Sequence, residues 1–313
     1  MSGGTARIGY LIMKCLFLYN PHSGKGRIAK KIAYIEKKLS EKYDEVDIVA
    51  TQSVTDLETR VREGASRYDV ILFSGGDGTF NNVLHGVGEQ NVTLGYLPSG
   101  TVNDVARSLG IPHSVKGALK VALNGVPQKL DCMRINGSHY AMYVTAAGAF
   151  TSATYSTPQT KKKKFGRIAY AIHALKKNMK FEVFPISGTC DGHKFESHGV
   201  LVLVMNGRSI AGFPINKEAS MEDGTLEIAL VKQAKKPNVF QKFGKYFSLA
   251  SLLLFGVRIK KRDIEFMCGE DIRIDTDENV VWDFDGEEGI RGNVHIELLR
   301  KRVTLIVPKN KKI

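Results

Sequence analysis

The residues best suited to bind a phosphate form one stretch, residues 74–82 (S-G-G-D-G-T-F-N-N). They follow residues 68–73, an apolar run that is typical of a strand buried on both faces. The three glycines have no Cβ, so the backbone of this strand-to-helix turn can approach an anion closely. The first N–H groups of a helix beginning at Thr79 or Asn81 would point at the same anion. This stretch therefore predicts a phosphate site.

Asp77 lies between two of these glycines, where its carboxylate would repel a phosphate. We expect it to face a metal ion that accompanies a nucleotide, or to orient other polar groups. The simpler alternative is a strand-to-helix turn whose glycines serve backbone geometry alone.

Two further turns have the same construction. Residues 20–26 (N-P-H-S-G-K-G) follow the apolar run 14–19 and lead into a helical pattern. Their spacing differs from G-x-x-x-x-G-K-[ST], so they are not a Walker P-loop. Residues 95–110 (G-Y-L-P-S-G-T-V-N-D-V-A-R-S-L-G) again run from a strand through a glycine turn into a helix. Three such turns at strand ends favour a shared ligand site over geometry alone.

Together the three motifs resemble the diacylglycerol kinase catalytic domain of the soluble bacterial lipid kinases, which sphingosine and ceramide kinases share. The resemblance runs from about Lys14 to about Pro308. Residues 165–170 (F-G-R-I-A-Y) are similar to the family's mid-chain segment, and residues 281–288 (V-W-D-F-D-G-E-E) to its C-terminal D-G-E signature. Asn82 and Val105 depart from the family pattern, which affects local packing more than chemistry.

The resemblance implies a lipid kinase that uses ATP and magnesium. Glu287 would be the general base for the substrate hydroxyl, and Asp285 would act on the metal or on orientation. On spacing alone, however, Asp285-Gly286 predicts a plain hairpin turn. Asp77 and Asp104 would jointly face the catalytic magnesium. The predicted nucleotide-binding residues are Asn20, Ser23, Gly24, Lys25, Thr51, Gly75, Gly76, Asp77, Gly78, Thr79, Asn81 and Thr101.

A second, structural magnesium is implied by residues 223–226 (D-G-T-L), with Asp223 and the main chain of Ser220 and Thr225 as ligands. Oxygen ligands around a tight glycine turn suit a hard cation. The alternative is a type I′ turn without metal. Asp131, at the expected domain junction, either pairs with Lys25 or is a surface acid.

The hydrophobic periodicity divides the chain in two. Strands at 14–19, 45–50, 70–73 and 92–97 alternate with helices at 56–66, 81–88 and 103–109, which predicts a parallel sheet with ligand loops at the strand carboxyl ends. From Gln128 onward, short β-branched or aromatic runs between Gly, Asn and Asp turns predict an antiparallel sandwich, interrupted by helices at 166–178 and 238–255.

We therefore expect the fold class α/β plus β. An N-terminal parallel-sheet α/β nucleotide-binding domain would span residues 13–126, and a C-terminal antiparallel β-sandwich domain for the lipid substrate would span 127–308. The last strand run, within 298–308, either stays in the second domain or returns to the first.

The charge is unevenly distributed. The 313 residues carry a formal net charge of +13, with eight Lys or Arg and no acid between Gln159 and Lys180, and nine and no acid between Lys232 and Arg262. Such blocks are either solvated faces or sites for an anionic partner. No nucleic-acid-binding motif accompanies them, so we expect no nucleic acid partner and favour an anionic membrane surface. The sequence also allows a homodimer.

The four cysteines lie far apart with no C-x-x-C pair, which indicates reduced thiols in a cytoplasm. No apolar run is long enough to span a membrane, and the N-terminus lacks a secretion signal. Residues 1–12 precede the family start near Met13 as an alternative start or an extension. We expect a cytoplasmic protein that associates peripherally with membranes.

Three functions compete. The first is a kinase for diacylglycerol or a related lipid. The second is a kinase of a soluble substrate, because NAD kinases and phosphofructokinases share the G-G-D-G turn. The third is a nucleotide-binding regulator without catalysis. The G-T-x-N-D stretch and the basic blocks argue against the second, and Glu287 argues against the third.

Overall fold

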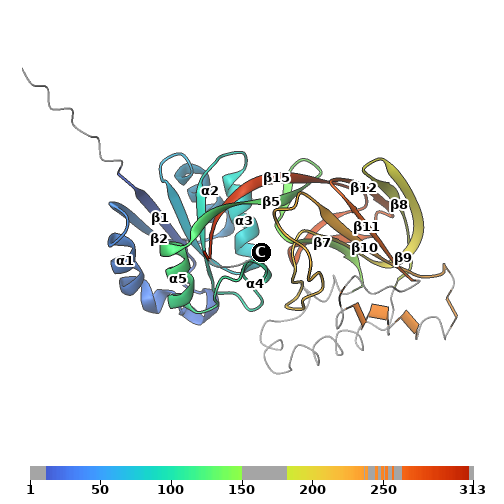
Figure 1. Cartoon of the computed structure of the whole chain (residues 1–313), viewed down its shortest axis with the longest axis horizontal. Helices are drawn as coiled ribbons and strands as arrows, with labels where there is room; N and C mark the ends of the chain where they lie inside the picture. Colours follow the sequence, from blue (N-terminus) through green and yellow to red (C-terminus); the bar gives the residue numbers. More distant parts are fainter. Residues whose placement is uncertain are drawn as a thin grey trace, which may run out of the picture.

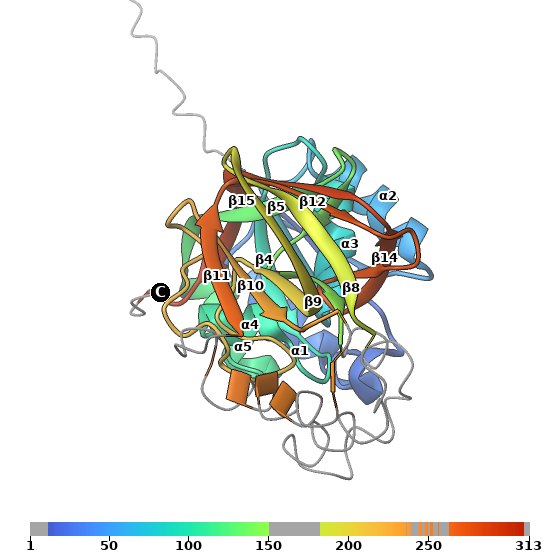
Figure 2. The ribbon, with the colours of Figure 1, turned by 90° about the vertical axis from the view of Figure 1, so that its right-hand side faces the viewer.

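The computed structural model describes residues 12–149, 182–235, 237–238, 244–245, 248–249, 251–252, 256 and 263–309. Figure 1 shows two lobes joined by two long strands that run side by side. All labelled helices belong to one lobe, and the other is built from strands (Figures 1 and 2). Among the described residues, no helix has the length and apolar character needed to cross a bilayer.

The first lobe contains a parallel sheet. Its strands are β1 (Lys14–Tyr19), β2 (Glu45–Ala50), β3 (Val70–Gly75) and β4 (Thr93–Pro98), in the order β2-β1-β3-β4. β3 is buried along its whole length, as its uninterrupted apolar run predicts. Near the carboxyl ends of β3 and β4, Phe73, Phe80 and Tyr96 form an aromatic cluster with ring centroids 5.1–5.3 Å apart.

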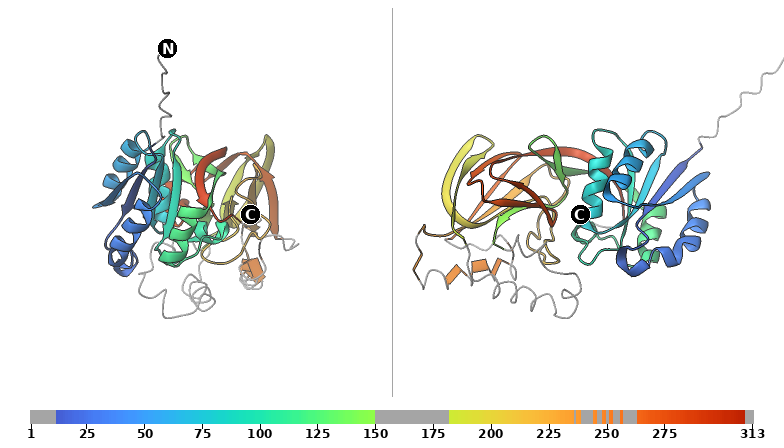
Figure 3. Two further views of the ribbon diagram at one scale, coloured as in Figure 1. Left: turned by 60° about the vertical axis from the view of Figure 1, so that its left-hand side comes forward. Right: turned by 180° about the vertical axis from the view of Figure 1, so that it is seen from behind.

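Helices cover both faces of this sheet (Figure 3). They are α1 (Ile32–Ser40), α2 (Val54–Gly64), α3 (Asp77–Val87), α4 (Asp104–Leu109) and α5 (Val115–Asn124), with short 3₁₀ turns at η1 (Ser23–Gly26) and η2 (Ala29–Lys31). Serine caps begin two of them: Ser53 accepts from the Asp56 N–H at 3.0 Å, and Ser114 from the Gly117 N–H at 3.2 Å. α2 packs beside α3.

The second lobe is antiparallel. Its strands, together with the two that join the lobes, are β5 (Val126–Ile135), β6 (His139–Ala141), β7 (Val144–Gly148), β8 (Phe184–Cys190), β9 (His193–Met205), β10 (Leu226–Lys232), β11 (Ile264–Gly269), β12 (Asp271–Thr276), β13 (Val281–Phe284), β14 (Glu287–Arg291) and β15 (Val294–Val307). Their inward faces bury a separate apolar core that includes Phe184, Ile228 and Trp282.

β15 connects the two sheets. It pairs with β12 in the second lobe, and then runs parallel to β4, with Thr304 opposite Thr93 and Leu305 opposite Leu94. β5 pairs antiparallel with β15 along most of this path. The sequence left the course of the last strand undecided, and the structure returns it to the first lobe.

The predicted parallel and antiparallel strands are confirmed, but the bounds of several elements differ. α3 begins at Asp77, earlier than the predicted start at Thr79 or Asn81. The separate runs that the sequence predicts at 293–299 and 303–307 form one strand, β15, with an irregularity between Leu299 and Val303. The runs predicted at 180–186 and 188–190 likewise join in β8, and those at 194–196 and 200–205 join in β9, whereas the run predicted at 139–145 divides into β6 and β7. α5 and β14 were not predicted. The helix expected at 166–178 lies outside the described residues, as does most of the one expected at 238–255.

Candidate active site

Three serines hold the predicted phosphate turns together at the carboxyl ends of β1, β3 and β4. The Ser23 and Ser99 hydroxyl oxygens lie 3.0 Å apart. The Ser74 hydroxyl donates to the Leu97 carbonyl at 2.9 Å and also lies 3.2 Å from the Ser99 hydroxyl. Because parallel strands end at one edge of their sheet, motifs far apart in the sequence meet here.

The second and third turns are in close contact. The Gly75 carbonyl accepts from the N–H groups of Ser99 at 2.7 Å and Gly100 at 3.2 Å. A Cβ placed on Gly100 would lie 2.6 Å from the Gly76 Cα, closer than real Cβ contacts come. The two glycine turns therefore pack backbone against backbone and form a cradle whose N–H groups a phosphate could approach.

The early start of α3 changes the position of Asp77. Gly76 is the N-cap, so Asp77 lies in the first helical turn. Its carboxylate accepts from the Val105 N–H at 3.2 Å, which joins the beginning of α3 to that of α4. The N–H groups of the first turn of α3 remain directed at the cradle.

Asp77 and Asp104 form an acidic pair beside the cradle. Burial raises the pKa of Asp77 to about 7, and the neighbouring Asp104 carboxylate adds repulsion. Burial also raises the pKa of Asp104, partly offset by donors from the second lobe, the Ser209 hydroxyl at 2.6 Å and the Gly212 N–H at 2.9 Å. Two carboxylates that resist ionisation suit a hard cation, which would favour their charged forms.

This pair provides a partial donor set for magnesium. In the part of the chain that the structure describes, no three His, Cys, Asp or Glu residues cluster as a metal site. A magnesium ion held here would therefore take its remaining ligands from water and nucleotide phosphates, as is usual for kinase sites.

The D-G-E segment is both a hairpin turn and part of this site. Asp285 and Gly286 have φ angles of 54° and 91°, as the two central residues of a type I′ turn between β13 and β14 require. The turn brings the exposed Glu287 against α3, where a Cβ on Gly78 would lie 2.4 Å from Glu287 Oε1. The hairpin interpretation and the functional one are compatible.

Asp285 is almost fully buried, with 3% of its surface exposed. Its carboxylate accepts from the N–H groups of Met142 at 2.6 Å, Tyr143 at 2.9 Å and Val144 at 3.1 Å. Burial raises the pKa of Asp285 to about 6, although these N–H groups oppose the rise. The carboxylate is thus engaged in fixing the hairpin, which supports the orientation role.

Asn81 also contacts the second lobe. Its amide nitrogen donates to the Tyr140 carbonyl at 2.5 Å and lies 3.3 Å from Asp285 Oδ2. These contacts give Asn81 a part in positioning the hairpin, while its contribution to nucleotide binding stays a prediction.

The other predicted nucleotide ligands surround the cradle. The Thr51 hydroxyl donates to the Tyr19 carbonyl at 3.3 Å, and Asn20 Oδ1 accepts from the His22 N–H at 2.8 Å. Thr79 packs on Gly75, and Thr101 is exposed. Gly24 and Lys25 belong to η1, and the Lys25 side chain lies outside the described part of the chain.

The predicted structural metal turn is an Asx turn. Asp223 Oδ1 accepts from the Thr225 N–H at 3.1 Å. Gly224 has a φ of +71°, but Asp223 does not have a positive φ, so the turn is not of type I′, while metal binding at this turn stays a prediction. Burial raises the pKa of Asp223, and Ser220 is among its main-chain donors.

Asp131 lies beside this turn. It is 1% exposed, and its carboxylate accepts from the N–H groups of Lys301 at 2.6 Å and Gly224 at 2.9 Å. The surface-acid alternative is therefore wrong, and both oxygens are engaged away from η1.

Sequence reasoning missed three functional contacts. Ser74 and Ser99 stand inside the motifs but have no signal that singles them out from their neighbours. Ser209 donates to Asp104 from 105 residues away, and no local pattern marks it. Only the fold brings these hydroxyls to the site.

A glycine cradle, an acidic pair and a carboxylate on a facing hairpin are the parts of a phosphoryl-transfer site, and the surrounding fold is that of a two-domain kinase. Residues 14–135 match the diacylglycerol kinase catalytic domain, and residues 144–307 match the YegS C-terminal NAD kinase beta sandwich-like domain.

Relatives of known name agree with these matches. A diacylglycerol kinase from Bacillus subtilis is 28% identical over 299 residues, covering 94% of this chain and 96% of the relative. A diacylglycerol kinase from Staphylococcus haemolyticus is 28% identical, and the match covers 95% of this chain and 89% of the relative. A crystal structure of a diacylglycerol kinase from Bacillus anthracis superposes with a TM-score of 0.77 at 28% identity, covering 94% and 96%. The chain belongs to the bacterial diacylglycerol kinase family and is a lipid kinase at the level of that family.

Proposed function

We propose that this protein transfers the γ-phosphate of ATP to the hydroxyl of diacylglycerol or a related lipid, with Glu287 as the general base. The observation that carries the proposal is the contact between Glu287 and Gly78, because it brings a carboxylate from the second lobe to the first turn of the phosphate helix. A general base must lie within hydrogen-bonding reach of the hydroxyl that accepts the phosphate. The contact between Glu287 and Gly78 lies at the junction of the two lobes, where nucleotide and lipid would meet.

In this proposal the residues divide the work. The cradle around Gly75, Gly76 and Gly100 binds the phosphates with backbone N–H groups, helped by the Thr79 hydroxyl. Glu287 accepts the proton of the substrate hydroxyl while the oxygen of that hydroxyl attacks the γ-phosphorus of ATP. The bond from the γ-phosphorus to ADP breaks, and ADP leaves. Asp285 keeps the hairpin in place through its three main-chain bonds.

Two magnesium sites belong to the proposal. Asp77 and Asp104 would hold the catalytic ion, which would neutralise charge on the phosphates. The Asp223 turn would hold a structural ion with main-chain oxygens of Ser220 and Thr225. Its support is the Asx turn at Asp223, an exposed carboxylate that stands close enough to the buried Asp131 to be repelled by it.

Membrane association is also a proposal. It rests on the charge of the two basic blocks, which would attract anionic lipids at the surface where diacylglycerol resides. The whole of the first block and more than half of the second fall outside the described residues.

The test is ATP consumption with magnesium in mixed micelles containing diacylglycerol, sphingosine or no lipid, with NAD as a soluble substrate. Glu287→Gln should lower kcat for diacylglycerol by about 10²- to 10⁴-fold, the usual contribution of a general base, and leave ATP binding intact. Glu288→Gln is the matched control because the neighbouring side chain on β14 points to the opposite face.

Phosphorylation of NAD without any lipid would replace the proposal with the soluble-substrate alternative. ATP binding without transfer to any acceptor would favour the regulator. Equal losses in the Glu287 and Glu288 variants would reject Glu287 as the base.

A further inference from the structure

We infer that Asn81 and His85 are positioning residues, which hold the hairpin that carries Glu287 by binding the backbone of Tyr140 to one face of α3. The kinetic consequence of this inference rests on the proposed function, whereas its structural consequence does not.

Three side chains spaced four residues apart contact Tyr140. Asn81 donates to its carbonyl at 2.5 Å, its N–H donates to His85 Nε2 at 3.4 Å, and its hydroxyl donates to Glu89 Oε1 at 3.2 Å. Residues at i and i+4 lie on one face of a helix, so α3 and the turn after it present a continuous stripe to a single residue of β6.

The segment after Tyr140 continues to the catalytic hairpin. The N–H groups of the next residues, Met142, Tyr143 and Val144, bind the Asp285 carboxylate, two positions before Glu287. The amide nitrogen of Asn81 lies 3.3 Å from the same carboxylate. One short stretch of chain thus contacts α3 on one side and the hairpin on the other.

Ring packing supports the same connection. The His85 ring meets the Tyr140 ring edge-on at 5.3 Å and the His139 ring at 6.2 Å. The His139 ring in turn lies 5.8 Å from Phe284, which directly precedes Asp285. Ring contacts as well as hydrogen bonds therefore connect α3 to the hairpin.

The Tyr140 N–H requires an unprotonated acceptor on His85. Burial lowers the pKa of His85, as does the neighbouring His139, so the ring is neutral near pH 7 even though Glu58 of α2 opposes this shift. With Nε2 as acceptor, the ring proton lies on Nδ1.

The function of this stripe follows from where α3 begins. Its first turn contains Gly78, which faces Glu287, and Asn81 lies one turn further along. The same helix therefore positions both the phosphate turn and the hairpin that carries Glu287, and so sets the distance between them. Since a shift of about 1 Å between reacting groups can cost about 10²-fold in rate, this connection would set kcat rather than ATP binding.

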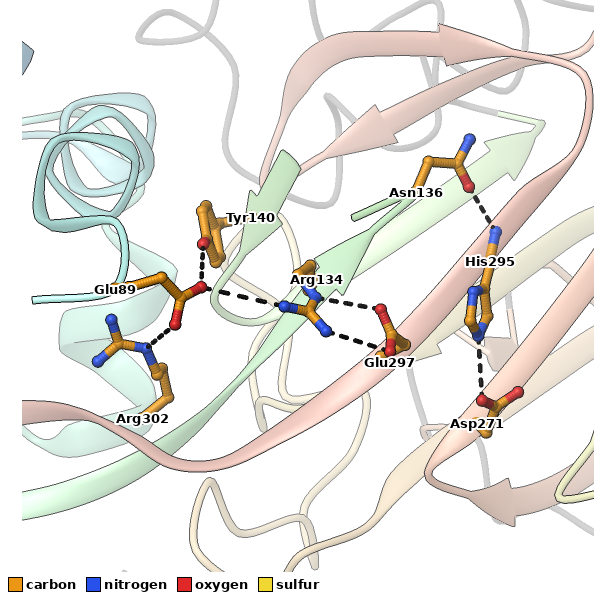
Figure 4. Close-up of polar contacts among 8 residues, drawn as sticks. All are labelled: Glu89, Arg134, Asn136, Tyr140, Asp271, His295, Glu297 and Arg302. Carbon is orange, nitrogen blue, oxygen red and sulfur yellow. Dashed lines mark hydrogen bonds and ion pairs between the residues drawn. The ribbon is translucent and has the colours of Figure 1, made fainter. Parts of the chain in front are cut away.

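The outer end of the stripe contributes little. Glu89 is 74% exposed, and it lies 3.9 Å from both Arg134 and Arg302, as Figure 4 shows together with its bond to Tyr140. Exposed pairs at such distances are weak. Tyr140→Phe removes only this outer contact, so it is a matched control for the backbone contacts.

The experiment compares wild type, His85→Ala, His85→Gln, Asn81→Ala and Tyr140→Phe as full chains. Hydrogen–deuterium exchange is measured on peptides covering 283–291, with peptides of β1 and β3 as internal reference. His85→Ala and Asn81→Ala should speed hairpin exchange by about tenfold and leave the reference unchanged, because only local protection is lost. His85→Gln, whose amide oxygen replaces the acceptor, and Tyr140→Phe should stay within about twofold of wild type.

The kinetic arm measures kcat and the KM for ATP with diacylglycerol. His85→Ala should lower kcat by about tenfold with KM within about twofold, and His85→Gln should restore it. The inference is wrong if both alanine variants exchange like wild type in the hairpin. It is also wrong if His85→Ala and His85→Gln have equal effects, or if only Tyr140→Phe loses hairpin protection or kcat. A wild type inactive on every lipid would reject the proposed function, while the exchange data would still decide this inference.

Discussion

Asp285 illustrates how one side chain serves a site that it does not itself face. It adopts a left-handed backbone conformation and binds the three consecutive N–H groups of Met142, Tyr143 and Val144, where the chain enters β7. Glu287, two residues later, is exposed and makes its contact with Gly78 only if this anchor holds. The buried acid and the exposed acid of the D-G-E motif therefore have different tasks.

Asp285→Asn tests the anchor. Asn tolerates the left-handed conformation as well as Asp does, so the turn itself should persist. The amide nitrogen, however, would face N–H donors that now lack an acceptor, and we expect a loss of about 1–3 kcal/mol in the free energy of unfolding. Urea unfolding at pH 7.5 measures this loss, with Asp275→Asn, an exposed position of β12, as the control. Unchanged stability would show that the three bonds contribute nothing.

Asp77 should make stability depend on pH. Its folded-state pKa of about 7 exceeds its ordinary value of 3.8, so the folded protein holds this proton more tightly than the unfolded chain does. The bound proton of Asp77 therefore stabilises the folded state at low pH, and this contribution to the free energy of unfolding is lost as pH rises from about 4 to about 7. Asp77→Asn should therefore gain stability over wild type, by an amount that grows by up to about 2.6 kcal/mol between pH 5 and pH 8, since one pKa unit corresponds to about 1.4 kcal/mol.

Urea unfolding without nucleotide or magnesium measures this difference. Asp104 and Asp285 also have raised pKa values and their carboxylates repel that of Asp77, so the difference between the two proteins reports Asp77 together with its repulsion by these two acids. A difference that stays constant with pH would contradict the assignment. Added magnesium should stabilise wild type more than the variant.

At the scale of elements, the contact between α3 and the β13–β14 hairpin forms the site. α3 supplies the phosphate turn at its start and binds β6 along its length, and the hairpin reaches its first turn. Neither element alone places a carboxylate beside a glycine cradle.

Gly78→Ala tests this contact. The new methyl group would meet the far end of the Glu287 side chain, which can rotate away. Because alanine is favoured over glycine inside helices by about 0.5–1 kcal/mol, stability should be kept or improved. The displaced carboxylate should lower kcat by about 10- to 100-fold. In a Glu287→Ala background the same substitution should have no further effect on kcat, and an additive loss would mean that Gly78 acts through another group.

At the scale of the whole molecule, β15 makes the first lobe depend on the last residues of the chain. Leu305 is fully buried in the main core, and its strand covers the edge of β4. A fragment of residues 13–126 would lack this strand and expose an apolar sheet edge.

We therefore expect the 13–126 fragment to aggregate or to give a poorly dispersed NMR spectrum, as uncovered edges do. Joining residues 302–309 to it through a flexible linker should restore a soluble monomer. A well-folded 13–126 fragment without the added strand would show that β15 is dispensable for the first lobe.

Features that depend on local chain chemistry could be predicted from the sequence. Alternating strands and helices, the glycine turns at the ends of β3 and β4, and the D-G hairpin follow from side-chain periodicity and from backbone conformations that few residues adopt. The start of α3 was misplaced because the glycines at 75, 76 and 78 suggested a longer turn than the one that forms.

Which of these features come into contact depends on the packing of the whole chain. Asn81 and Asp285 are 204 residues apart, and Ser209 and Asp104 are 105 apart. The burial of Asp131 and the pairing of β15 with β4 likewise depend on how the two lobes join. No periodicity or spacing encodes such contacts, because they arise from the combined packing of elements whose local patterns are each compatible with other arrangements.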